Sequence, residues 1–133
     1  MKFNSLRSNC KINLFLNVGK KFKKTKLHNI QSLIFIINLH DVIKIRKINK
    51  SKDIIKFSGL FANQVKIKDN SILRSFVLLR RKGFIKDGSH YEVKINKKIP
   101  VFSGLGGGSS NSASIIKYFL RKKELKNKNF EYF

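Results

Sequence analysis

The sequence has 133 residues, of which 30 are lysine or arginine and 7 are aspartate or glutamate, so its formal net charge is +23. This length predicts one domain that can bury roughly two-thirds of its unfolded surface. The one cysteine excludes an internal disulfide, and the longest apolar runs, such as residues 33–37, are too short to span a bilayer. Because the chain does not start with the apolar stretch of a signal peptide, we expect a cytoplasmic protein.

The basic charge suggests a nucleic-acid-binding module as one alternative. However, lysine and arginine are enriched along the whole chain and accompany 17 isoleucines and 13 asparagines. That composition is typical of a genome-wide codon bias, so we expect no specific nucleic-acid partner and only salt-sensitive binding to polyanions. The three histidines and single cysteine form no recognisable metal-binding cluster.

Apolar and polar residues alternate in several segments, as they do in half-buried strands. The predicted strands are residues 11–18, 33–38, 42–48, 54–57 and 91–96. Two basic segments, 20–26 and 49–52, are predicted to be exposed loops. The sequence contains no internal repeat and no linker that would divide it into two domains.

The first predicted strand carries Lys11 and Asn13 on one face, because side chains alternate along a strand. A lysine beside an asparagine can contact a substrate hydroxyl or a phosphoryl group in transfer. The alternative is that Lys11, one of 24 lysines, only solvates a surface.

Two helices are predicted, over residues 70–82 and 110–123. For the first, Asp69 or Asn70 is the expected N-cap and Gly83 the stop signal. Its buried side is predicted to consist of Ile72, Phe76 and Leu79. Strands followed by interleaved helices predict an α+β fold, a two-layer sandwich of a mixed sheet and helices.

Four of the eight glycines lie within residues 104–108, and we call residues 100–108 the glycine loop. Glycine adopts positive φ freely, so successive N–H groups can converge on one anion. A helix with Ser109 or Ser110 as its N-cap is predicted to follow, and its N-terminus would bring a partial positive charge to the same place. This pattern indicates a phosphate-binding loop.

A flexible Gly/Ser linker is the alternative interpretation of this segment. The alternating strand at 91–96 and the apolar spacing of Ile115 and Phe119 argue against it, because both flanks are patterned. The segment is not a P-loop, since it lacks the Gly-Lys-Ser/Thr ending. Nor is it a dinucleotide fingerprint, since Ser109 stands where the third glycine belongs.

Three segments carry a resemblance to a known family. Residues 100–113 resemble the ATP-binding glycine motif of the GHMP kinases, and the triple glycine followed by Ser-Ser-Asn is the form of the 4-diphosphocytidyl-2-C-methyl-D-erythritol kinase family. Residues 10–16, CKINLFL, are similar to the opening strand of that family, and residues 27–33, LHNIQSL, resemble its Tyr-His-x-Leu-Gln segment. The three motifs occur in the order of the family.

The resemblance implies transfer of the ATP γ-phosphoryl group, with Mg²⁺, to the 2-hydroxyl of 4-(cytidine 5′-diphospho)-2-C-methyl-D-erythritol in the non-mevalonate route to isoprenoid precursors. It implies that Lys11 is catalytic and that Asn13 and His28 bind substrate, with Leu27 in place of the aromatic residue that stacks on the cytosine. The ATP-binding residues that it implies are Pro100, Val101, Phe102, Ser103, Gly104, Leu105, Gly106, Gly107, Gly108, Ser109 and Ser110.

The sequence departs from the family after the glycine loop. The family's catalytic aspartate lies downstream in a Gly-Ala-Asp-Val-Pro-like segment, whereas no aspartate follows Asp87 here, and Glu124 and Glu131 resemble no catalytic motif. We therefore expect residues 1–133 to be the N-terminal, ATP-binding domain without the C-terminal domain, and to have little or no kinase activity alone. Another GHMP kinase, acting on homoserine or mevalonate, is the alternative, which the segment from His28 to Gln31 disfavours.

Overall fold

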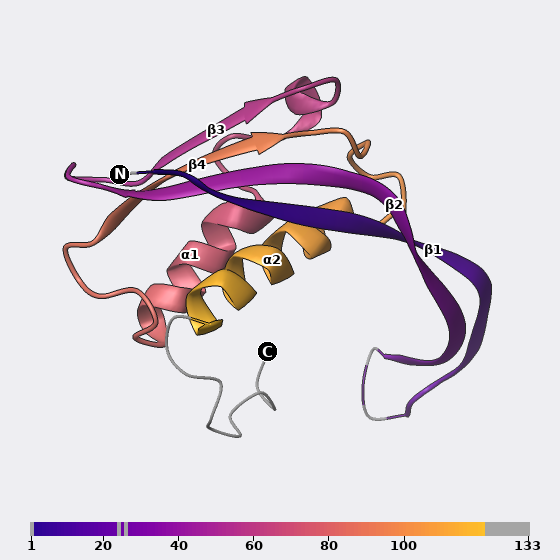
Figure 1. Ribbon diagram of the computed structural model, residues 1–133. Helices are drawn as coiled ribbons and strands as arrows, with labels where there is room; N and C mark the ends of the chain where they lie inside the picture. The colour runs from indigo at the N-terminus through magenta and orange to yellow at the C-terminus, as the bar shows by residue number, and fades with distance from the viewer. Residues whose placement is uncertain (1, 24, 26, 122–133) are drawn as a thin grey trace.

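The computed structural model describes residues 2–23, 25 and 27–121. Its elements in chain order are β1 (Asn4–Lys21), β2 (His28–Ile48), β3 (Ile54–Ser58), the 3₁₀ helix η1 (Ala62–Gln64), α1 (Ser71–Arg81), β4 (His90–Asn96) and α2 (Gly107–Arg121). The sheet order is β1-β2-β4-β3, and β3 runs parallel to β4 while the other pairs are antiparallel. Both helices lie on one face of the sheet (Figure 1). The predicted two-layer α+β sandwich with a mixed sheet is confirmed.

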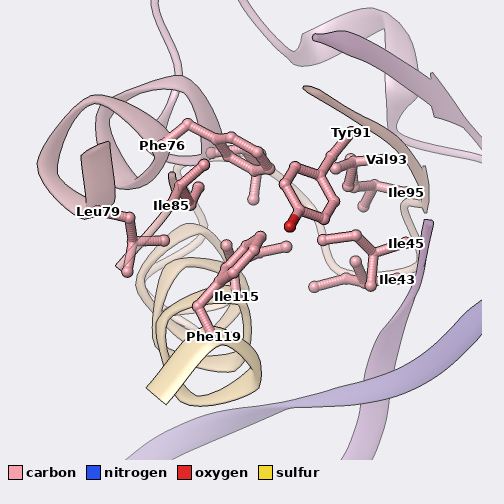
Figure 2. Packing of buried hydrophobic residues seen from close by; sticks show 11 residues of the cluster. Ile43, Ile45, Phe76, Leu79, Ile85, Tyr91, Val93, Ile95, Ile115 and Phe119 are labelled. Carbon is pink, nitrogen blue, oxygen red and sulfur yellow. The ribbon is translucent and has the colours of Figure 1, made fainter. Parts of the chain in front are cut away.

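The core lies between the sheet and the two helices. Ile43 and Ile45 of β2 and Val93 and Ile95 of β4 alternate toward the helices and are fully buried. Opposite them, the predicted buried side of α1, made of Ile72, Phe76 and Leu79, is confirmed. Figure 2 shows the rings of Phe76, Tyr91 and Phe119 gathered between the layers, where Tyr91 and Phe119 meet edge to face with 4.9 Å between ring centroids.

Helix α1 begins where the sequence predicts. Of the two expected caps, Asn70 is the one used, because its Oδ1 accepts hydrogen bonds from the N–H groups of Ile72 and Leu73, both at 3.1 Å. Asp69 is not the cap; its carboxylate is bound by the guanidinium of Arg74 at 2.7 and 2.9 Å. Gly83, with φ at 69°, follows the end of the helix as predicted.

The first two strands are longer than predicted. β2 runs unbroken through residues 39–41, where the sequence predicts a gap between two strands, because β1 pairs with it throughout: Asn9 lies opposite His40 and Ser8 opposite Asp41. The pairing of the two strands contains a register shift between Asn9 and Lys11, which is an irregularity of the β-bulge type. β1 also extends into the predicted loop 20–26 and includes its first two residues, Lys20 and Lys21. Residues 24 and 26 of that loop lie outside the described part.

Beyond the helices, the paired ends of β1 and β2 continue as a two-stranded ribbon that curls away from the rest of the sheet (Figure 1). We call residues 14–21 and 28–36 the apolar arm, because the side chains of this ribbon are exposed although many are large and hydrophobic. These are Leu14, Phe15, Leu16, Val18, Ile30, Leu33, Ile34, Phe35 and Ile36.

Helix α2 begins at Gly107, three residues before the predicted start, so the predicted caps Ser109 and Ser110 are wrong. The N–H of Ser110 already donates to the carbonyl of Gly106 at 2.9 Å, which is a helical bond and places the two serines inside the first turn. Residues 122 and 123 of the predicted helix lie outside the described part. Among the described helices, none combines the length and hydropathy needed to cross a membrane.

Candidate functional site

A cavity of about 650 Å³ opens at the glycine loop. Lys11 of β1 and the first turn of α2 form one side, and the segment from η1 to the start of α1 forms the other. The predicted binding residues that line it are Lys11, Pro100, Val101, Phe102, Ser103, Gly104, Gly106, Gly107, Gly108 and Ser109.

The backbone of the loop alternates in the sign of φ. Residues 102, 104 and 106 have φ of 61°, 77° and 72°, and the residues between them do not have positive φ. Such alternation is the backbone pattern of an anion-binding nest, in which successive N–H groups turn toward a common point. The N–H groups of Gly107, Gly108 and Ser109 add to it, since the first residues of a helix have no carbonyl partner within it. The backbone beside the cavity therefore has the conformation that a phosphate-binding loop requires, and phosphate binding itself stays a prediction.

The other two predicted ATP-binding residues, Leu105 and Ser110, do not line the cavity. The carbonyl of Leu105 accepts a hydrogen bond from the N–H of Lys11 at 2.9 Å. The hydroxyl of Ser110 donates to the carbonyl of Asn9 at 2.5 Å and accepts from Ser8 at 2.9 Å. Both residues therefore tie the loop to β1 and do not line the cavity.

Gly107 allows the backbone of α2 to lie close to the side chain of Ile99, because glycine has no Cβ. A Cβ built on Gly107 would lie 2.8 Å from Cγ2 of Ile99, whereas one on Gly108 would meet nothing nearer than the Ser71 hydroxyl at 3.6 Å. Because Ile99 is fully buried, it has little room to move. The first turn of α2 is thus held against the segment between β4 and the glycine loop.

A buried carboxylate supports both flanks of the loop. Asp41 is fully buried and accepts hydrogen bonds from the N–H groups of Lys98 and Ile99 at 2.7 and 2.9 Å. It also accepts from the ammonium of Lys97 and from the side-chain amide of Asn111 in α2. The residues before and after the glycine loop are therefore bound to one side chain of β2.

Lys11 and Asn13 lie together, as the alternation along the strand predicts. The Lys11 ammonium donates to Oδ1 of Asn13, and the Asn13 amide donates to the Ser32 hydroxyl at 2.6 Å. The stem of Lys11 runs beside Gly106, at which a Cβ would come within 3.3 Å of Lys11 Cγ. Lys11 lines the cavity and Asn13 lies next to it along β1.

His28 lies away from this cluster. It pairs with Lys21 at the far end of the apolar arm, and its Nδ1 is 3.1 Å from the carbonyl of Gly19. Neither His28 nor its neighbour Leu27 lines the cavity. The structure therefore unites Lys11, Asn13 and most of the glycine loop, and leaves His28 outside that group.

The cavity also includes residues that no sequence motif indicated. The wall opposite the loop is joined to it by a hydrogen bond of 3.0 Å from the N–H of Val101 to Oε1 of Gln64. Five of these residues come from segments remote from the loop in sequence, so no local spacing could have found them: Phe57, Gln64, Val65, Asp69 and Arg74. Lys97 also lines the cavity and lies three residues before the loop.

The charges around the cavity are mainly positive. Among the described residues that line it, Lys11, Lys66, Arg74 and Lys97 are basic and Asp69 is the one carboxylate. The hydrogen bond from Arg74, together with its charge, holds the pKa of the Asp69 carboxyl below its ordinary value. The described part of the chain has no group of three or more His, Cys, Asp or Glu side chains that could hold a metal ion. The site therefore suits an anionic ligand.

This chain is similar to known proteins in sequence and in fold. A family model described as the GHMP kinases N terminal domain matches residues 70–131. The 4-diphosphocytidyl-2-C-methyl-D-erythritol kinase of Pelagibacter ubique (strain HTCC1062) is 42% identical over 123 residues, which are 92% of this chain and 42% of that protein. The enzyme of the same name from Ureaplasma parvum serovar 3 is 34% identical over 95% of this chain and 47% of its own length. The chain spans less than half the length of these curated relatives.

One solved structure shares the fold over most of the chain. It is a crystal structure of 4-(cytidine 5′-diphospho)-2C-methyl-D-erythritol kinase, with a TM-score of 0.68 and 21% sequence identity. The match covers 93% of this chain and 42% of that one. The arrangement of the sheet and helices is therefore that of a kinase domain with a known structure.

Proposed function

Since this chain belongs to the GHMP kinase superfamily, we propose that it forms the ATP-binding part of a 4-diphosphocytidyl-2-C-methyl-D-erythritol kinase. Such an enzyme transfers the γ-phosphoryl group of ATP to the 2-hydroxyl of 4-(cytidine 5′-diphospho)-2-C-methyl-D-erythritol. The observation that carries the proposal is the anion-binding nest of residues 102–106, which lies at the start of the 15-residue helix α2 and beside Lys11.

The nest and the helix would hold the phosphates. Backbone N–H groups bind oxyanions without side-chain reorganisation, and the helix dipole adds about half a positive charge at the same point. Phosphoryl transfer depends mainly on positioning and on stabilisation of negative charge. The ties of the loop to β1 through Leu105 and Ser110 would keep these donors in place while the phosphates bind.

Lys11 would act on the phosphoryl group in transfer. Its ammonium lies at the edge of the loop and is oriented by Asn13, so its charge would stabilise negative charge on the transferring group or on the attacking oxygen. Asn13 and the apolar arm would then receive the second substrate, with His28 at the distal end available for the cytosine. This arrangement would place the hydroxyl of the substrate and the γ-phosphate on either side of Lys11.

The described residues supply no obvious acceptor for the proton of the attacking hydroxyl. Among those that line the cavity, Asp69 alone carries a carboxylate, and two hydrogen bonds commit it to Arg74. We propose that the general base comes from outside the described residues. The chain would then bind nucleotide and turn it over slowly, because a missing base costs about 10²- to 10⁴-fold in rate.

Mg²⁺ would be held here chiefly through the phosphates of the nucleotide. The cavity offers it Ser109 and Asp69 but no acidic cluster, and Mg²⁺ commonly keeps several waters and bridges to substrate phosphates. When bound, it would neutralise phosphate charge and orient the γ-phosphoryl group.

Titration with Mg·ATP by calorimetry tests the proposal. A salt concentration of about 0.3 M suppresses non-specific anion binding to the basic surface. Lys11→Met should weaken binding by about tenfold or more, since it removes a charged hydrogen-bond donor. Lys44→Met, at an exposed position on β2, removes the same charge away from the cavity and should bind as the wild type does. Equal affinities for all three proteins, or no saturable binding, would contradict the proposal.

Cytidine 5′-diphosphate distinguishes this kinase from those of homoserine and mevalonate. Saturable binding of cytidine 5′-diphosphate to the Mg·ATP-saturated chain would support a second, cytosine-accepting site. Simple displacement of ATP by cytidine 5′-diphosphate would indicate one shared phosphate site and favour another GHMP kinase.

A further inference from the structure

Phe102 differs from the rest of the described chain in two ways. Among the described non-glycine residues, it is the one with a positive φ, which is 61°. It also lines the cavity although it is 89% exposed. A bulky side chain in this conformation is a backbone outlier that costs conformational energy. An exposed phenyl ring adds no burial to compensate for it.

Local structure gives no reason for a phenylalanine at this position. The turn is closed by the hydroxyl of Ser103, which donates to the carbonyl of Pro100 at 3.0 Å and does not involve the ring. Glycine would adopt the same φ without penalty, as it does at positions 104 and 106. Strain of this kind, held at the rim of a site, is commonly associated with a binding role.

The cavity lining combines polar groups with apolar surface. The glycines and Lys11 bring N–H groups and a positive charge to it, and Phe57, Val65 and Val101 bring apolar surface. The neighbour of Phe102, Val101, is hydrogen-bonded to Gln64 on the opposite wall, so the strained turn is fixed beside that wall. A nucleotide whose phosphates lie in the nest must extend its ribose and base away from them, and the apolar lining suits a flat heterocycle.

We propose that the Phe102 ring stacks on the purine of the bound nucleotide. This inference rests on the proposed function and adds to it the group that would hold the base. Aromatic rings and nucleobases stack face to face because both present flat, polarisable surfaces. The backbone strain would place the ring over the cavity in advance, so that less side-chain freedom is lost when the nucleotide binds.

Three variants separate the ring from the backbone. Phe102→Gly removes the ring and the strain, Phe102→Leu keeps an apolar side chain on the same backbone, and Phe102→Trp keeps an aromatic surface. Because the sequence has no tryptophan, the last variant also introduces a single indole fluorophore. The probes are Mg·ATP and magnesium tripolyphosphate, which share the phosphates but not the base.

The expected result is that the ratio of Mg·ATP affinity to tripolyphosphate affinity falls about tenfold in Phe102→Gly and Phe102→Leu relative to the wild type. The ratio is compared because residue 102 also belongs to the nest, so its backbone can affect the binding of both probes. Phe102→Trp should retain wild-type affinity, and its fluorescence should change with Mg·ATP but not with tripolyphosphate. A ratio in Phe102→Leu equal to that of the wild type would overturn this inference alone. Failure of the wild type to bind Mg·ATP would overturn the proposed function together with it.

Discussion

The side-chain amide of Asn111 donates a hydrogen bond to Oδ2 of Asp41 over 2.9 Å and so binds α2 to β2. The other oxygen of the same carboxylate holds the N–H groups of Lys98 and Ile99, which precede the glycine loop. One buried side chain therefore sets the distance between the end of β4 and the start of α2. The nest of N–H groups depends on that distance.

Removal of this carboxylate should be costly. Asp41→Ala leaves the Lys97 charge buried and two N–H groups without an acceptor, so we expect a loss of about 3–5 kcal/mol in the free energy of unfolding. Asp87→Ala, at an exposed turn, is the matched control and should change it by less than about 0.5 kcal/mol. Urea unfolding measures both, and similar values for the two variants would refute the structural role of Asp41.

Adjacent glycines at the start of α2 should respond in opposite directions to the same substitution. Gly107→Ala drives a methyl group to 2.8 Å from Ile99 and should destabilise the protein by about 1–3 kcal/mol while weakening Mg·ATP binding. Gly108→Ala meets only ordinary contacts and should stabilise the helix by about 0.5–1 kcal/mol. Thermal unfolding with and without Mg·ATP tests the pair. Loss of stability in both variants would mean that the first turn requires glycine for another reason.

The backbone strain at Phe102 is measurable without any ligand. Phe102→Gly should be more stable than Phe102→Ala by about 1 kcal/mol, because alanine keeps the Cβ that makes a positive φ unfavourable. Urea unfolding of the two variants gives this difference directly. A greater stability for the alanine variant would show that the turn carries no strain at this residue.

The exposed side chains of the apolar arm should promote association rather than folding stability. Val18 and Ile30 lie opposite each other, 57% and 61% exposed, so the double variant Val18→Thr/Ile30→Thr should shift the free energy of unfolding by less than about 0.5 kcal/mol. It should also lower light scattering and binding of a hydrophobic dye. Ile45→Thr, at a fully buried position, should instead cost about 2 kcal/mol. Undiminished association in the double variant would show that these two side chains do not drive it.

The ion pair between Arg46 and Glu92 should make stability depend on pH. Arg46 lies opposite Glu92 in the sheet and donates to its Oε2 at 2.8 Å, and this hydrogen bond lowers the pKa of the Glu92 carboxyl from its ordinary value of 4.5. A lowered pKa gives stability that is present above the ordinary value and lost as the pH falls through the folded-state value.

Glu92→Gln tests this dependence. The stability difference between wild type and Glu92→Gln should therefore shrink as the pH falls from about 6 to about 3. Urea unfolding across that range measures it. A difference that stays constant with pH would indicate that Glu92 contributes through packing alone.

Features that depend on near neighbours in the chain could be predicted from the sequence. The start and buried side of α1 followed from Asn70 and from the spacing of Ile72, Phe76 and Leu79, because a helix is defined by contacts three and four residues apart. The positive φ at Gly104 and Gly106 followed in the same way from glycine itself, whereas the positive φ at Phe102 had no such signal. The α+β class and the position of the glycine loop were therefore determined by the sequence itself.

Features that depend on distant pairings were decided only by the tertiary structure. The unbroken course of β2 through Asp41 requires β1 as a partner, and the burial of Asp41 requires donors more than 50 residues away. Gln64 lines the cavity for the same reason, since its partner Val101 lies 37 residues away in the sequence. Periodicity reports which face of an element is apolar but not which segment covers it, so the wall opposite the glycine loop had no signal in the sequence.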